Sequence, residues 1–277
     1  MIQQISPHDF SNQYVPNRHI EDGDYVIYYK ENSILLKANG DDFALSQKKD
    51  LGEFLNQTAS VFLFALNNIP CFLILDQLVL DESQFIYKDL SFFRTARQRE
   101  IAWISILGFQ LKNWYAQNQF CGKCGTRTQQ KSDERALICP NCNTIVFPKI
   151  SPAIIVAIIS NNKLLLARNA SFPASWYSLI AGYADVGESL EETVIREVKE
   201  EVGLDVKNIR YYRSQPWPIS SSMMIGFIAE ADENQPIVID NKEITHAEWF
   251  ERGHLPAHPP KISISGEMIE KFEKGEL

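Results

Sequence analysis

The amino-terminal third of the chain carries short apolar runs that are bounded by turn residues. Tyr25–Tyr29 and Val61–Phe64 are rich in β-branched and aromatic side chains, and Asn67–Asn68 is a turn signal between two such runs. This pattern predicts a β-rich domain over residues 1–95. Cys71 lies inside an apolar run, so we interpret it as a buried core residue.

The spacing of apolar residues changes after residue 95. Over residues 96–118 they recur three and four positions apart, as on one face of an α helix: Trp103, Leu107, Leu111 and Trp114. We interpret this segment as a helix that connects two domains. Strand character returns in residues 149–277, where the continuous apolar run Ala153–Ile159 predicts a strand inside a sheet.

Length and charge narrow the class of protein. The chain has 277 residues, which fits two domains and a small insert, and its net charge of -8 argues against a general binder of nucleic acid. Met1–Phe10 lacks the pattern of a signal peptide, and Val61–Leu80 is too interrupted for a membrane span. These features predict a cytoplasmic protein. If it handles phosphates, metal cations must offset the negative charge at its site.

Two pairs of cysteines predict a metal site. Cys121 and Cys124 form one Cys-x-x-Cys pair, Cys139 and Cys142 form the other, and 14 residues separate the pairs. In a reducing compartment this spacing is typical of zinc, with disulfides or an iron–sulfur cluster as alternatives. Four thiolates saturate zinc and leave no position for water, so the metal would be structural. We therefore predict a zinc ribbon over residues 119–148.

A possible nucleic-acid contact follows from the surroundings of the cysteines. Four basic residues lie near them: Lys123, Arg127, Lys131 and Arg135. Zinc ribbons can bind nucleic acid, although basic residues on a small exposed module are usually only solvated.

A second motif is an acidic segment with helix signals at both ends. Ser189 and Glu192 form a capping box, which predicts that a helix begins at Ser189. Gly203 is placed as the carboxyl-terminal cap, so the helix has about four turns. Its predicted buried stripe steps by four residues: Leu190, Val194, Val198 and Val202.

Three glutamates of this helix lie close together. At about 100° per residue, Glu197 and Glu201 share the face of the apolar stripe, and Glu200 lies at its edge. Such carboxylates repel one another, and an unpaired charge beside apolar side chains is costly. A hard divalent cation such as Mg²⁺ or Mn²⁺ relieves both effects. The alternative is a solvated acidic face that pairs with Arg196 and Lys199.

The run Gly182–Leu204 resembles the Nudix box, Gly-x5-Glu-x7-Arg-Glu-Val-x-Glu-Glu-x-Gly-Leu in this chain, with every fixed position filled. The resemblance implies an α/β fold, the Nudix α/β/α sandwich, at the carboxyl end, preceded by the zinc ribbon and the β-rich domain. It implies that the divalent metals are held by Glu197, Glu201 and the carbonyl of Ala181. It also implies structural support from three residues: Gly182, Glu188 and Arg196.

The chemistry that the box implies is hydrolysis of a pyrophosphate. Metal ions neutralise its oxygens, lower the pKa of a bound water and align the attack with the leaving phosphate. One carboxylate must accept the proton of the water. The sequence leaves two candidates for this base, Glu201 and Glu200.

A segment after the box narrows the substrate. Ser214–Ser222 resembles the Ser-Gln-Pro-Trp-Pro-Phe-Pro-x-Ser signature of NADH pyrophosphatases, and six of its eight fixed positions match. Ile219 replaces Phe and Ser220 replaces Pro, so an aromatic stacking partner is lost and the expected loop is less stiff. The resemblance implies substrate contacts along the segment: Gln215, Pro216, Trp217, Pro218, Ile219, Ser220, Ser221 and Ser222.

Further residues match this subfamily at single positions. The resemblance implies that Glu243, at the end of a Val-Ile-Asp-x-Lys-Glu-like stretch, is another metal ligand. It implies that Phe147, Ser265 and Arg94 contact substrate.

The resemblance also implies a reaction and partners. NADH or NAD would be cleaved to nicotinamide mononucleotide and AMP, NAD-capped RNA 5′ ends would be further substrates, and the chain would form a homodimer without membrane contact. Two alternatives are a broader dinucleotide or ADP-ribose pyrophosphatase and, from another class, a zinc-ribbon nucleic-acid-binding regulator.

Overall fold

The computed structural model describes residues 1–40, 42–55, 58–78, 84–170, 176–239 and 241–277. The chain forms two compact units. The first consists of Ile2–Lys149 with Pro218–Ser220, and the second of Met1, Ile150–Trp217 and Ser221–Leu277. The finer division at residues 95, 118 and 148 stays a prediction.

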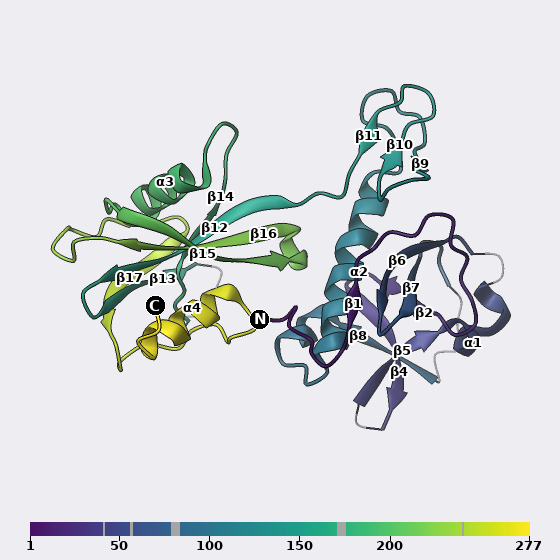
Figure 1. Ribbon diagram of the computed structural model, residues 1–277, viewed down its shortest axis with the longest axis horizontal. Coiled ribbons are helices and arrows are strands. Elements are labelled where there is room, and N and C mark those ends of the chain that lie inside the picture. The colour runs from purple at the N-terminus through teal and green to yellow at the C-terminus, as the bar shows by residue number, and fades with distance from the viewer. Residues whose placement is uncertain (41, 56–57, 79–83, 171–175, 240) are drawn as a thin grey trace. The chain divides into compact units, whose positions relative to one another are not determined.

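The first unit contains a β-rich part, as predicted (Figure 1). Within the described residues its sheet has the order β1-β6-β7-β2-β5-β4-β3, with β8 paired to β4. Asn67 and Asn68 both have positive φ, which confirms the predicted turn between β6 and β7. The elements are β1 Phe10–Ser11, β2 Tyr25–Ile27, β3 Tyr29–Lys30, β4 Ser33–Asn39, β5 Asp42–Gln47, α1 Lys48–Leu51, η1 Gly52–Leu55, β6 Ser60–Leu66, β7 Ile69–Ile74, β8 Phe85–Asp89 and η3 Leu90–Arg94.

The predicted helix of residues 96–118 is α2, Arg99–Gln117. Its burial is broader than the single stripe expected, because every residue from Ile101 to Ile106 is buried. One cause is the close approach of the Tyr29 side chain to the helix backbone at Gly108. A Cβ added to Gly108 would lie 2.6 Å from the phenolic oxygen of Tyr29. That oxygen donates a 2.6 Å hydrogen bond to the carbonyl of Ser105. The helix therefore packs tightly on its own sheet. Among the described helices, none has both the length and the apolar character needed to cross a bilayer.

The cysteine module follows α2 within the first unit. It is a small sheet of three strands in the order β11-β10-β9: β9 Gln129–Gln130, β10 Leu137–Ile138 and β11 Ile145–Val146.

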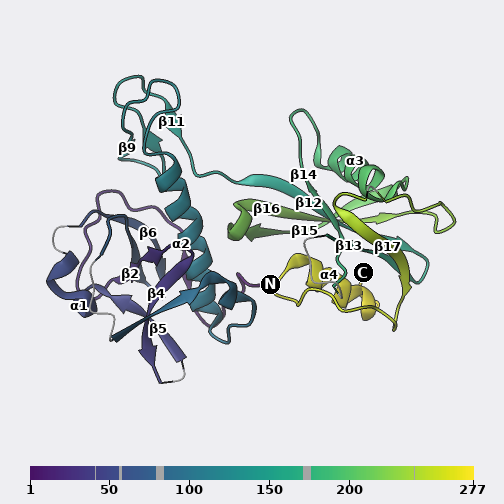
Figure 2. The same cartoon turned by 180° about the vertical axis from the view of Figure 1, so that it is seen from behind.

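The second unit is a sheet between two helices, α3 Leu190–Val202 and α4 Ile264–Glu273. Figures 1 and 2 show them on opposite faces of the sheet, whose order is β15-β16-β12-β13-β17 with β14 paired to β12. The strands are β12 Ser151–Ser160, β13 Lys163–Asn169, β14 Ile180–Tyr183, β15 Lys207–Trp217, β16 Ser222–Glu230 and β17 Ile244–Glu251.

Strand β12 explains why both faces are covered. Alternate side chains of a strand point to opposite faces. Ile154 and Val156 pack in the cluster of Val194 and Val198 from α3, whereas neighbouring residues of β12 pack in the cluster that contains Met268 from α4. The continuous apolar run of β12 is therefore buried on both sides, and the predicted α/β/α sandwich is confirmed.

Candidate active site and zinc site

Local hydrogen bonds fix both ends of α3. The Ser189 Oγ accepts a 3.2 Å bond from the Glu192 amide, and the Glu192 carboxylate accepts a 2.8 Å bond from the Ser189 amide. Gly203 ends the helix in the left-handed conformation, with φ of 75°. Both predicted caps are confirmed, so the acidic residues occupy defined positions on a rigid element.

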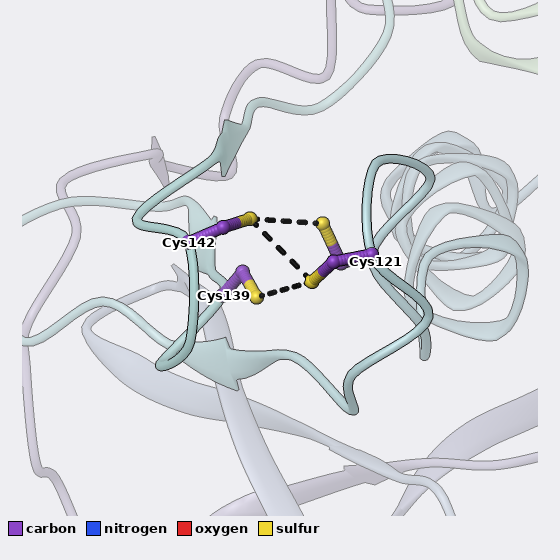
Figure 3. Close-up of side chains that lie close together, drawn as sticks. Cys121, Cys139 and Cys142 are labelled. Atoms are coloured by element: carbon purple, nitrogen blue, oxygen red, sulfur yellow. Dashed lines mark hydrogen bonds between the residues drawn. The ribbon is translucent and has the colours of Figure 1, made fainter.

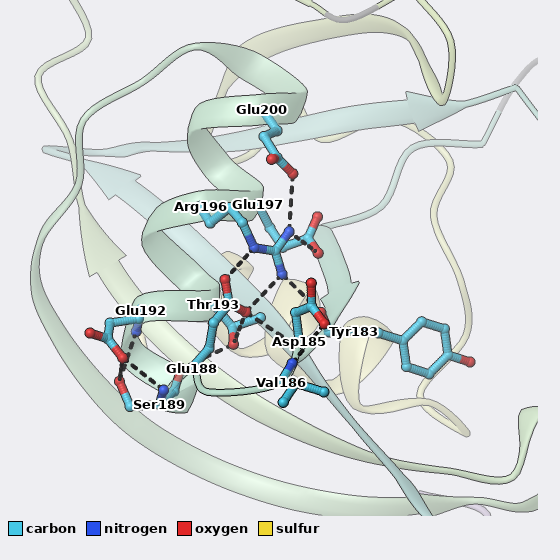
Figure 4. A network of polar contacts seen from close by, with 10 residues as sticks. All are labelled: Tyr183, Asp185, Val186, Glu188, Ser189, Glu192, Thr193, Arg196, Glu197 and Glu200. Atoms are coloured by element: carbon cyan, nitrogen blue, oxygen red, sulfur yellow. Dashed lines mark hydrogen bonds and ion pairs between the residues drawn. The ribbon is translucent and has the colours of Figure 1, made fainter.

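Arg196 lies at the centre of a network that joins α3 to the loop before it (Figure 4). Its Nε and Nη2 donate to the two oxygens of Glu188 at 2.5 and 3.0 Å. Its Nη1 donates to Glu197 at 2.8 Å and to Glu200 at 3.0 Å, and Nη2 also reaches the carbonyl of Tyr183 at 2.9 Å. One guanidinium thus hydrogen-bonds three carboxylates, offsets part of their negative charge and ties the loop to the helix.

The Glu188–Arg196 pair perturbs both ionisable groups. Arg196 lowers the pKa of Glu188 to about 2, and the Asp185 amide contributes by donating to the same carboxylate. Glu188 in turn raises the pKa of Arg196. Because the folded pKa of Glu188 is below its unfolded value of about 4.3, the pair stabilises the fold above that pH. This contribution is lost as the pH falls toward 2.

We expect Glu188→Gln to destabilise the protein at pH 7 and to do so progressively less as the pH is lowered to 3.5. The reason is that the Glu188 carboxyl of the unfolded wild type becomes protonated below about pH 4.3, so the ionised carboxylate of the folded state contributes progressively less stability. Urea unfolding of both proteins across this range measures the difference. Glu191→Gln, on the exposed side of the first turn of α3, is the control. A destabilisation by Glu188→Gln that is constant with pH would contradict the pairing.

Glu197 lies directly against the backbone of β14. A Cβ added to Gly182 would lie 1.9 Å from the carboxylate carbon of Glu197, so only glycine leaves room for this side chain. Ala181, the preceding residue, pairs with Ile155 of β12, which holds β14 in the sheet. The Glu197 side chain is only 13% exposed. The sequence motif did not reveal this packing, although it contained both residues.

The other acids surround Glu197 with negative charge. Burial raises the pKa of Glu197, Arg196 lowers it, and the charges of Glu200 and Glu243 raise it again. Glu243 therefore acts on this site across 46 residues of sequence. Glu201 is buried, with 7% of its surface exposed, whereas the Glu200 side chain is 62% exposed.

This donor set suits a hard divalent cation. Carboxylates and a backbone carbonyl are the oxygen ligands that Mg²⁺ and similar ions prefer. Glu197 is held beside the Ala181–Gly182 backbone, and Glu201 is a buried carboxylate next to apolar core residues, where an added positive charge is favourable.

The four cysteines meet at one point of the ribbon (Figure 3). The Sγ atom of Cys142 lies 3.6 Å from that of Cys121 and 3.5 Å from that of Cys124, and Cys124 and Cys139 are 3.5 Å apart. Among the described residues, they are the one set of three or more candidate ligands whose atoms all lie within 4.8 Å of one another. The prediction that these cysteines form one metal site is confirmed in its geometry.

Each cysteine pair is followed by the same local structure. Gly125 and Asn143 have φ of 74° and 58°, so the chain turns back after each pair. The next residues, Thr126 and Thr144, place their hydroxyls beside Cys124 and Cys142 and lower the pKa of those thiols. Sequence reasoning missed these threonines. The signal was present, because each stands two positions after the second cysteine of its pair.

We expect Cys139→Ser to abolish stoichiometric zinc binding, because Cys139 is fully buried and a hydroxyl is a poor substitute for a thiolate. Metal analysis of the purified protein measures this, and hydrogen exchange of β9 and β10 should show loss of protection. Cys71→Ala is the matched control, since Cys71 is also fully buried but lies in β7. Zinc retained at full stoichiometry in Cys139→Ser would refute the four-thiolate site.

The segment Ser214–Ser222 is not the loop that was expected. Its residues as far as Trp217 lie in β15, which pairs with β16. In this pairing Pro216 lies opposite Met223, and Trp217 lies opposite Ser222. Pro218–Ser220 forms a short 3₁₀ turn, η4. The prolines are compatible with this structure because β15 is the edge strand of its sheet, where the missing amide of Pro216 costs no ladder bond.

Four residues expected to contact substrate are buried: Gln215, Pro218, Ser222 and Ser265. Gln215 is fully buried, and its amide donates to the Ile262 carbonyl at 2.9 Å while accepting from the Ile264 amide at 2.6 Å. Ser265 is 5% exposed, and its hydroxyl lies 2.8 Å from that of Ser178. Gln215 thus joins β15 to the start of α4, whereas Ser265 joins α4 to the segment before β14.

The remaining expected contacts are more accessible. Ile219 is 40% exposed and Phe147 55% exposed. Arg94 is exposed at the end of η3, with its guanidinium 5.0 Å from the ring centre of Phe93. Phe147 and Arg94 belong to the first unit, whereas the acids of α3 belong to the second. The stretch that leads to Glu243 includes Asp240, which lies outside the described residues.

Three domain families match the chain. The NUDIX domain matches residues 149–272, the NADH pyrophosphatase zinc ribbon domain residues 116–147, and the NADH pyrophosphatase-like rudimentary NUDIX domain residues 23–114. Residues 149–272 thus form a domain of the Nudix family. The Nudix domain contains the box helix α3, and the ribbon match contains all four cysteines.

Curated Nudix relatives match over part of their length. The NAD-capped RNA hydrolase NudC of Pseudomonas aeruginosa (strain LESB58) is 41% identical over 169 residues, which cover 60% of each chain. NudC of Salmonella typhi is 42% identical over 163 residues, covering 59% of this chain and 63% of its own. The matched part thus spans about 60% of the length of these relatives. A Nudix hydrolase structure from Nitrosomonas europaea is 22% identical, with a TM-score of 0.49, and covers 56% of this chain and 90% of its own.

Proposed function

We propose that the chain hydrolyses the pyrophosphate bond of NADH and NAD to give nicotinamide mononucleotide and AMP, and that it also removes NAD caps from RNA 5′ ends. The observation that carries the proposal is the packing of the Glu197 carboxylate on Gly182, where the negative charges of Glu200 and Glu243 act on it. The names of the NudC relatives support NAD as the substrate class.

Residues of α3, of β14 and of the segment before β17 would hold the metal and activate the water. Glu197, Glu201, Glu243 and the carbonyl of Ala181 would hold Mg²⁺ or Mn²⁺, which supplies charge neutralisation and a bound water of lowered pKa. Glu200 or Glu201 would accept the proton of that water. Arg196 orients Glu197 and Glu200 by direct hydrogen bonds, and Glu188 fixes Arg196 in turn.

The strand-and-turn segment ending at Ser222 would select the substrate. Trp217 at the end of β15 and the exposed Ile219 in η4 are the side chains we assign to the base or nicotinamide ring. Isoleucine has no aromatic face, so discrimination between NADH and other dinucleotides should be weaker at this position. Phe147, Arg94 and the serines of the segment stay proposed substrate contacts.

The proposal includes zinc as the structural ion of the ribbon, a homodimer, and a cytoplasmic location. A reducing compartment keeps the four cysteines available as thiolates. Light scattering of the purified zinc-loaded chain tests the homodimer, and a monomeric mass would exclude it.

Product analysis tests the reaction. The full-length, zinc-loaded protein is incubated separately with NADH, NAD and ADP-ribose in the presence of Mg²⁺ or Mn²⁺, and products are separated by chromatography. We expect AMP and the reduced mononucleotide, formed fastest from NADH. Faster turnover of ADP-ribose would show that the changes at Ile219 and Ser220 have altered specificity. No turnover of any of the three would overturn the proposed activity.

A further inference from the structure

A cleft of about 690 Å³ lies within the first unit, apart from the residues of the Nudix box. Its walls come from the β3 region, the end of β7, the carboxyl-terminal half of α2 and the ribbon. Every lining residue lies between positions 28 and 137, and therefore outside the Nudix domain match of 149–272.

Hydrogen bonds hold the ribbon wall in place. Arg135 donates to the Asn12 side chain at 2.6 Å and to the carbonyl of Leu63 in β6. On the α2 side, the Thr128 hydroxyl donates to the Asn118 carbonyl at 2.6 Å. The two walls are thus tied to each other through side chains and backbone. The cleft is preformed, which lowers the entropic cost of binding a ligand.

The charge of the lining is opposite to that of the chain. Three cationic residues line the cleft, Lys30, Lys112 and Arg127, against one acidic residue, Asp76. The Lys112 ammonium also donates to the Glu31 carbonyl at 3.3 Å, and the Lys30 ammonium lies 5.4 Å from the ring centre of Tyr87. The whole protein has a net charge of -8, so this local excess is not a general property of its surface. Arg127 is exposed and has no ion-pair partner among the described residues. A cleft of this kind attracts an anion, and arginine in particular suits phosphate.

The dimensions and the other side chains exclude a lone phosphate as the best ligand. From Lys112 to its end at Gln117, α2 rises about 7.5 Å along its axis, and a cleft volume of about 690 Å³ is typical of sites for nucleotide-sized ligands. Leu75 offers apolar surface, since 44% of it is exposed. The amides of Gln119 and Gln130 can donate to and accept from base edges.

We propose that this cleft is a second ligand site, which binds a nucleotide unit through its phosphate and base. Arg127 and Lys112 would contact the phosphate, and the glutamines and Leu75 would contact the base. The nucleotide could be free or part of a single-stranded RNA. The inference does not require the Nudix chemistry, because no residue of the cleft takes part in it. It also gives the zinc a function, since Arg127 and Gln130 lie on the ribbon that the zinc would fold.

Equilibrium binding to full-length, zinc-loaded protein tests the site. The probes are AMP and a fluorescent six-nucleotide RNA with a 5′ hydroxyl, which has no pyrophosphate to hydrolyse. We expect Arg127→Gln to weaken binding of at least one probe about tenfold and to reduce its salt dependence. Lys123→Gln is the matched control, because Lys123 is an exposed ribbon cation outside the cleft lining and should change binding less than twofold.

The two probes separate the sources of the nucleotide. Loss of RNA binding in Arg127→Gln with AMP unaffected identifies an RNA segment as the ligand, and the reverse identifies a free nucleotide. Equal affinity of Arg127→Gln and wild type for both probes, or an equal loss in Lys123→Gln, would overturn the proposal. NADH turnover by the same variants is measured in parallel, and we expect it to match wild type. If the protein does not hydrolyse NADH but still binds a probe through Arg127, the proposed function is contradicted and the second ligand site is not.

Discussion

Glu201→Gln is expected to lower kcat for NADH hydrolysis about 10³-fold, the range seen when a general base or a metal-ligating acid is removed. Glu201 is a buried carboxylate on the sheet side of α3, in a helix whose two caps fix its position. Glutamine keeps the size and the hydrogen-bonding oxygen but removes the charge. Steady-state kinetics with NADH at saturating Mg²⁺, and a titration of Mg²⁺, measure the effect.

Comparison with Glu200→Gln separates the two roles that Glu201 could have. If Glu201 is chiefly a ligand, its variant should need more Mg²⁺ for half-maximal activity, while Glu200→Gln loses kcat at unchanged Mg²⁺ dependence. If Glu201 is the base, the pattern is reversed. Glu191→Gln, in the exposed first turn of α3, controls for a general loss of helix charge. Activity of Glu201→Gln within tenfold of wild type would remove this residue from both roles.

The helix α3 was predictable because its signals are local. The capping box of Ser189 and Glu192 and the left-handed Gly203 involve hydrogen bonds between residues three or four apart, so the sequence alone determines them. The faces of the helix follow from its period, which predicts Glu201 on the apolar face and Glu200 at its edge. In the structure Glu201 is 7% exposed and the Glu200 side chain 62% exposed.

Features that depend on a second strand were not predictable in the same way. The segment through Trp217 contains turn-forming prolines, and a strand was not expected. Its pairing with β16 decides the outcome, because the edge position of β15 tolerates Pro216. The buried Gln215 side chain likewise bonds to Ile262 and Ile264, which are 47 and 49 positions later in the sequence. These hydrogen bonds form only when the intervening chain folds back. Composition and spacing carry no record of such contacts.

The cleft of the first unit could not be predicted from the sequence either. Its cations at positions 30, 112 and 127 belong to a strand, a helix and the ribbon, and no motif joins them in the sequence. Basic residues of the ribbon were noted from the sequence, but only the structure separates Arg127, which lines the cleft, from Arg135, which is bound to Asn12 and the Leu63 carbonyl.

Gly182→Ala is expected to destabilise the protein by about 1–3 kcal/mol, as overpacking of a dense site does, and to lower kcat about 10²-fold. The added methyl group would lie 1.9 Å from the carboxylate carbon of Glu197, far inside any tolerated contact. The carboxylate must therefore move, and a displacement of about 1 Å at a reacting site is enough for this loss of rate. Urea unfolding and NADH kinetics measure the two effects. Gly23→Ala is the control, since an added Cβ there meets no atom within 4 Å.

A double-mutant cycle isolates the cause of that loss. If the methyl group of Gly182→Ala acts through the carboxylate, removing the carboxylate should remove the conflict. The double variant Gly182→Ala/Glu197→Ala should then be no less stable than Glu197→Ala alone, although both are inactive. If Gly182→Ala costs the same free energy of unfolding in both backgrounds, the glycine is required for another reason and Glu197 does not rest on it. Equal costs would therefore count against the arrangement in which the glycine of the Nudix box makes space for Glu197, the acid of the same box that we propose as a metal ligand.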